Sequence, residues 1–84
     1  MSRKDKLVAR ILTIPKDFTY DEAEALLAAF GFREMNKGKT SGSRVKFLRN
    51  DDMILLHKPH PRKVLPIYAV KQIVDKLKEC GDLL

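Results

Sequence analysis

The stretch that decides the fold reads Ser43-Arg44-Val45-Lys46-Phe47-Leu48-Arg49-Asn50-Asp51-Asp52-Met53-Ile54-Leu55-Leu56-His57. Residues 43–49 alternate: Val45 and Phe47 fall on one face of a predicted strand, and the residues between them fall on the other. Residues 50–52 are typical of a turn. Residues 53–57 are apolar at almost every position, which indicates a strand in the middle of a small sheet or one covered by helices. Together they predict an antiparallel hairpin.

The neighbouring segments add one strand and three helices. Residues 32–35 alternate as a short strand would, and complete a three-stranded antiparallel meander. A capping box formed by Thr19 and Glu22 predicts a helix that ends at Gly31, where a positive φ is needed. A short amphipathic helix is expected over residues 3–12. A longer one begins at Pro66 and stops at Gly81. Its apolar stripe is predicted to contain Ile67, Val70, Ile73, Val74 and Leu77, with Cys80 buried on the same stripe.

These elements predict an α+β two-layer sandwich, in which a three-stranded antiparallel sheet carries helices on one face and leaves the other to solvent or a ligand. The 84 residues form a single domain, of which residues 1–17 are an N-terminal extension and residues 18–84 the main part. A single cysteine excludes an intramolecular disulfide bond. No apolar segment is long enough to span a membrane, so we expect a cytoplasmic protein that is monomeric by default.

The net charge of +6 is concentrated in the middle of the chain. Residues 36–63 hold eight bases against two acids, whereas the flanking segments are balanced. A segregated basic surplus favours a polyanion-binding face, although a solvated loop and strand would show the same pattern. An anionic membrane surface and an acidic protein are also compatible with this charge. The candidate nucleic-acid-binding residues are Lys37, Lys39, Ser41, Ser43, Arg44, Lys46, Lys58, Arg62 and Lys63.

Within this segment, Arg44 and Lys46 share one face of the strand at a spacing of about 7 Å. This spacing is close to the distance between phosphates along a nucleic acid chain, so it favours backbone contacts that are insensitive to sequence. Phe32 and Phe47 are expected in the core rather than as base-stacking platforms. The sequence therefore favours recognition of a nucleic acid by shape and backbone over stacking of unpaired bases.

From Phe30 to about Gly81 the chain resembles the HicA family of bacterial toxins. The resemblance is carried by Gly31-Phe32, Gly42-Ser43, Phe47, His60-Pro61, Lys63, Leu65, Val70-Lys71 and Ile73-Val74, in this order and spacing. It implies a fold like that of double-stranded-RNA-binding domains, ribonuclease activity on messenger RNA, and a cognate HicB-like antitoxin. The family's Gly-Ser is normally followed by the histidine taken to be catalytic, and this chain has Arg44 there. A guanidinium can clamp a phosphate but cannot act as a general base.

Cleavage of RNA through its 2′-hydroxyl needs one group to remove a proton and another to protonate the leaving oxygen. His60 is our first candidate and His57 the second, with Arg44 as their electrostatic partner. Both histidines are also compatible with structural roles at a strand end or loop. As metal ligands they would make half a site, and we expect no metal and no cofactor.

Three functions are consistent with these features. The first is a HicA-like toxin that binds and cleaves messenger RNA by metal-independent acid–base chemistry. The second is a non-catalytic RNA-binding module on the same fold, in which Arg44 clamps phosphate. The third is a basic domain that meets an acidic protein.

Overall fold

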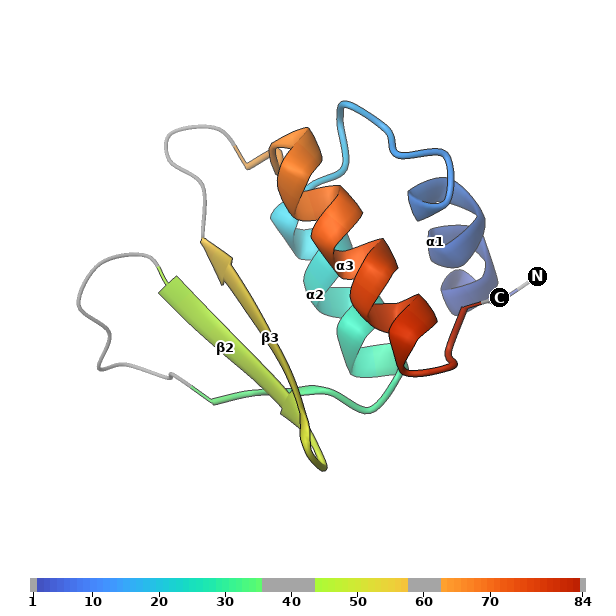
Figure 1. Ribbon diagram of the computed structural model, residues 1–84. Coiled ribbons are helices and arrows are strands. Elements are labelled where there is room, and N and C mark those ends of the chain that lie inside the picture. The colour runs from blue at the N-terminus through green and yellow to red at the C-terminus, as the bar shows by residue number, and fades with distance from the viewer. Residues whose placement is uncertain (1, 36–43, 58–62, 84) are drawn as a thin grey trace.

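The computed structural model describes residues 2–35, 44–57 and 63–83. In chain order the elements are α1 (Arg3–Ile11), α2 (Tyr20–Ala29), β1 (Arg33–Glu34), β2 (Arg44–Arg49), β3 (Asp52–His57) and α3 (Ile67–Glu79). The strands form one antiparallel sheet in the order β1-β2-β3. Figure 1 shows the helices on one side of β2 and β3, which confirms the predicted α+β sandwich.

Helix α1 is part of the core and is not a loose extension. Leu7 and Ile11 are buried among side chains from the rest of the domain. The Arg10 guanidinium ties α1 to α2, since its Nε lies 2.6 Å from Oε2 of Glu22 and its Nη2 lies 3.1 Å from Oδ1 of Asp17. The first residues of the chain therefore help to build the layer of helices that covers the sheet.

Helix α2 begins and ends where the sequence predicts. The Thr19 hydroxyl accepts a hydrogen bond from the Glu22 backbone N–H at 3.0 Å, and the Glu22 carboxylate accepts one from the Thr19 N–H at 3.0 Å. The reciprocal pair confirms the capping box. Gly31 has a φ of 91°, a conformation that favours glycine, and it turns the chain into β1.

The sheet buries the face that its apolar alternation predicts. Val45 and Phe47 of β2 are buried against the helices, together with Ile54 and Leu56 of β3. The middle strand is β2, whereas β3 lies at an edge. Of the two explanations that the sequence offers for this apolar run, cover by helices on one side is therefore confirmed, and a central position in the sheet does not apply. Because helices cover one side of the sheet, only every second side chain of β3 reaches the core, and Met53 on the other side is 44% exposed.

Helix α3 is capped by Pro66, whose φ of −65° suits a helix start, and Gly81 follows its end with a φ of 83°. Its buried stripe consists of Ala69, Val70, Ile73, Val74 and Leu77. Two expectations for this helix are wrong. Ile67 is 39% exposed, because it is the first helical residue and lies before the stripe begins. Cys80 is only partly buried, because the helix ends at Glu79 and the thiol lies at the cap.

Candidate nucleic-acid interface

The strand register places eight residues on the side of the sheet that faces away from the helices. Directly opposed residues of antiparallel strands point to the same side. Lys46 is opposite Leu55, Leu48 is opposite both Met53 and Arg33, and the Met35 N–H donates to the Lys46 carbonyl at 2.8 Å. We call this surface the open face. It consists of Arg33, Met35, Arg44, Lys46, Leu48, Met53, Leu55 and His57.

None of these eight residues is acidic, and three of them are bases. The acid of β1, Glu34, is opposite Phe47 and therefore falls on the helix side of the sheet. There it contributes, after burial, to raising the pKa of Tyr20 to about 12. The open face also carries apolar side chains, of which Met35 is 54% exposed. The arrangement is a cationic, partly apolar surface suited to a polyanion.

At one end of the open face the register brings together two predicted site residues. Arg44 is the first residue of β2 and is directly opposite His57, the last residue of β3. In such pairs the Cα atoms are about 4.5–5.5 Å apart. His57 is exposed to solvent. Two of the predicted site residues are therefore neighbours on adjacent strands.

Of the remaining predicted site residues, Lys46 and Lys63 lie in the described part of the chain. Lys46 is half-buried on the open face, and Lys63 is exposed just before α3. The backbone at Lys63 is fixed, because its carbonyl accepts a hydrogen bond from the Tyr20 N–H at 2.8 Å. The predicted residues that lie outside the described ranges are Lys37, Lys39, Ser41, Ser43, Lys58, His60 and Arg62.

Arg49 belongs to the basic segment of the sequence but not to the interface. Its guanidinium points to the helix side, where Nη2 lies 2.6 Å from Oδ2 of Asp82 and 3.3 Å from Oδ2 of Asp52. Nη1 donates to the Phe30 carbonyl at 2.9 Å, and the group stacks over the Phe32 ring at 4.4 Å. The hydrogen bond to Asp82 raises the pKa of Arg49, so its charge is permanent and locally compensated.

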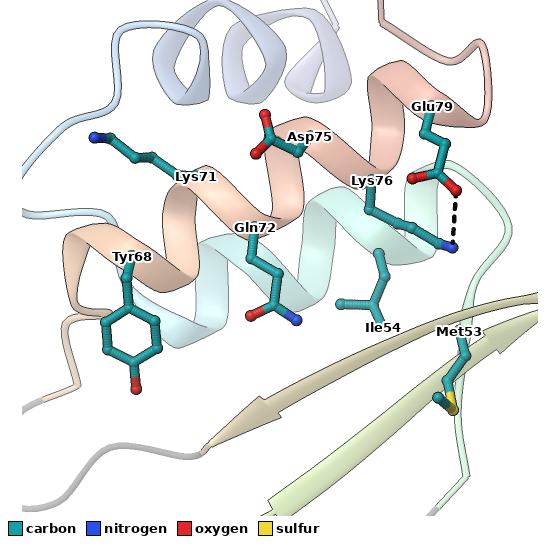
Figure 2. Close-up of a pocket in the computed structure, with 8 residues that line it drawn as sticks. All are labelled: Met53, Ile54, Tyr68, Lys71, Gln72, Asp75, Lys76 and Glu79. Carbon is teal, nitrogen blue, oxygen red and sulfur yellow. Dashed lines mark ion pairs between the residues drawn. The ribbon is translucent and has the colours of Figure 1, made fainter.

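Two surface residues that sequence reasoning missed stand out. Arg33 adds a third base to the open face, and extending the alternation from the buried Phe32 would have identified it. Tyr68 is 66% exposed at the start of α3. It lines a groove of about 430 Å³ between α3 and β3, shown in Figure 2. The helical period places Tyr68 opposite the buried stripe, and that signal was available.

The described residues contain no cluster of three or more histidine, cysteine or acidic side chains that could hold a metal ion. Within the same part of the chain, no helix has both the length and the apolar character needed to cross a bilayer. The one cysteine, Cys80, has a raised thiol pKa, caused first by burial and then by its hydrogen bond with the Asp52 carboxylate. A raised pKa keeps a thiol protonated and unreactive.

Residues 20–81 match the family described as the HicA toxin of bacterial toxin-antitoxin systems. The chain belongs to the HicA toxin family. The match covers well over half of the 84 residues and starts ten residues before the segment that carries the resemblance in sequence. It spans every element except α1. No similar curated protein and no similar solved structure was found. As a HicA toxin, the protein is the toxin component of a toxin–antitoxin pair, and its partner is an antitoxin.

Proposed function

We propose that this HicA toxin binds messenger RNA on its open face and cleaves it by acid–base chemistry without a metal ion. The observation that carries this proposal is the direct pairing of Arg44 with His57 at one end of a surface without acids. A group that can transfer a proton and a fixed positive charge are two of the parts that phosphodiester cleavage needs, and a second proton-transfer group is the third.

Binding rests on bases that the sheet presents at regular spacing. Arg44 and Lys46 are two residues apart on β2, a separation of about 7 Å along the strand. Arg33 of β1 lies across the sheet from them, beside Leu48. Contacts with successive phosphates carry little sequence information and weaken as salt rises.

Cleavage proceeds through the RNA itself. The 2′-oxygen loses its proton to one histidine and attacks the neighbouring phosphorus, while the bond from phosphorus to the 5′-oxygen breaks. The other histidine protonates the departing 5′-oxygen, which leaves a 2′,3′-cyclic phosphate and a 5′-hydroxyl. His60 and His57 supply these two roles, and Arg44 stabilises the negative charge that grows on the phosphate oxygens.

The antitoxin in this proposal is HicB-like and presents an acidic surface. By covering Arg44, Lys46 and His60, such a surface would neutralise the charge that attracts RNA and block the histidines.

The test incubates the purified protein with a labelled structured RNA at low salt in the presence of EDTA. We expect cleavage by the wild type and a loss of about 10²- to 10⁴-fold in rate for His60→Ala and His57→Ala. Lys78→Ala, an exposed change on α3, is the matched control and should cleave like the wild type. Cleavage that EDTA abolishes, or that both histidine variants retain, would contradict the mechanism.

Arg44 also favours a second candidate function, a toxin-family RNA-binding protein that has lost catalysis. The family's catalytic position holds a group that cannot accept a proton. In this case the wild type retards RNA on a gel without cutting it, and the decisive variant is Arg44→His. Cleavage by Arg44→His alone would support the binding function, since it would show that the site lacks only the imidazole.

A further inference from the structure

The first turn of α3 presents apolar surface to solvent. Tyr68 is 66% exposed, more than any other large apolar side chain in the described ranges, and the adjacent Ile67 is also exposed. The buried stripe of α3 lies on the opposite side of the helix. Packing of the core therefore does not account for an aromatic ring at this position.

The ring lies beside a groove. Tyr68 and Gln72 of α3 line it from one side and Met53 of β3 from the other, and its volume is about 430 Å³. Nε2 of Gln72 donates to the Leu55 carbonyl at 3.3 Å, a contact that holds α3 against the edge strand. Figure 2 shows the Tyr68 ring extending from the first turn of α3 toward the end of β3, the strand that finishes at His57.

The Tyr68 end of the groove carries a base and no acid among its lining residues. Lys71 lines the same groove one turn along the helix, and Lys63 precedes the helix. The first turn of α3 contains no acid. The acids of the groove, Asp75 and Glu79, lie about two and three turns further along α3. Glu79 is paired with Lys76 at 3.7 Å. A polyanion is therefore favoured at the Tyr68 end of the groove and disfavoured at the other end.

We infer that Tyr68 is a stacking platform for an unpaired RNA base, at the end of the hairpin that carries Arg44 and His57. The inference rests on the proposed RNA-binding function and deepens it, because it makes the ligand a single-stranded segment rather than a uniform duplex. An exposed ring can take the π-face of any base, while Lys71 of the same groove attracts the backbone. The buried rings of Phe32 and Phe47 cannot do so.

The test measures binding of an RNA of about ten nucleotides, made of uridine with one central adenosine. Its 2′-O-methyl groups prevent attack by the 2′-oxygen, so binding is observed without cleavage. We expect Tyr68→Ala to weaken binding by about 5- to 150-fold. Tyr68→Phe keeps the ring and should bind within about twofold of the wild type. Ile67→Ala, in the same turn, is the matched control and should bind normally.

Fluorescence gives a second readout that does not depend on stability. The chain has no tryptophan and two tyrosines, of which Tyr20 is buried. Stacking of a base on Tyr68 should quench the tyrosine emission of the wild type, and the quenching should disappear in Tyr68→Phe although that variant still binds.

The outcomes separate this inference from the function on which it rests. Wild-type affinity in Tyr68→Ala, with unchanged emission on binding, would overturn the stacking role and leave RNA binding intact. Equal losses in Tyr68→Phe and Tyr68→Ala would assign the effect to the hydroxyl and overturn stacking as well. Failure of the wild type to bind either this RNA or a duplex of about 16 base pairs would overturn the proposed function itself.

Discussion

Replacement of Ile11 by alanine should destabilise the whole domain, although this residue lies before the segment that matches the HicA family. Ile11 is fully buried. The substitution removes three carbon atoms, which are worth about 2.4 kcal/mol at about 0.8 kcal/mol each, and the cavity left behind adds to this. We expect a loss of about 3–4 kcal/mol. A chain of this length has a total stability of about 4–13 kcal/mol, so the loss is a large part of it.

The assay is urea unfolding followed by circular dichroism at neutral pH, together with thermal melting. The melting temperature should fall by about 12–30 °C, since each kcal/mol corresponds to about 4–8 °C in a domain of this size. Leu12→Ala is the matched control, because Leu12 is the next residue and is 44% exposed. It should cost less than about 1 kcal/mol. Equal losses in the two variants would refute the conclusion that α1 completes the core.

Three further predictions concern charge and backbone conformation. Lys46→Gln should reduce the slope of log affinity against log salt for single-stranded RNA by about 0.7, whereas Lys78→Gln should leave it unchanged; equal slopes would exclude Lys46 from the interface. Glu22 has a lowered pKa, mainly through its hydrogen bond with Arg10. Its ion pair therefore stabilises the fold above the unfolded pKa of about 4.3 and loses this effect as pH falls through the folded value. Urea titrations should show Glu22→Gln less stable than the wild type at pH 7, with a gap that closes in acid; a constant gap would contradict this. Gly31→Ala should cost about 1–2 kcal/mol in urea unfolding, because φ is 91° there, and a neutral result would rule out strain.

The helices and the hairpin could be predicted from sequence because their signals are local. The capping box is contained in the four residues from Thr19 to Glu22, and Gly31 follows the C-cap of α2 directly. The alternation of Val45 and Phe47 fixes which face of β2 is buried. Each of these features depends on propensities and periods within one element. They can therefore be recognised without knowing how the elements pack together.

The partners of Arg49 could not be predicted in this way. Charge counting assigns Arg49 to the basic segment, but its partners are the Phe30 carbonyl, 19 residues earlier, and Asp82, 33 residues later. The sequence shows that a base is present, and only tertiary structure shows whether an acid compensates it. The same holds for Tyr68, whose exposure follows from the helical period but whose groove depends on how α3 lies against β3.

The geometry of the candidate site is set at the opposite end of the hairpin. Arg44 is opposite His57 because only two residues separate Arg49 from Asp52, and the first of them, Asn50, adopts a left-handed φ of 52°. A slip of one residue would move His57 to the other face of the sheet. The ion pairs of Arg49 with Asp52 and Asp82 hold this turn against the end of α3. In the proposed function, Arg49 therefore supports the candidate site through strand register and not through a phosphate contact. An Arg49 variant should accordingly lose RNA binding only to the extent that it loses stability. For the protein that remains folded, the slope of log affinity against log salt should be unchanged.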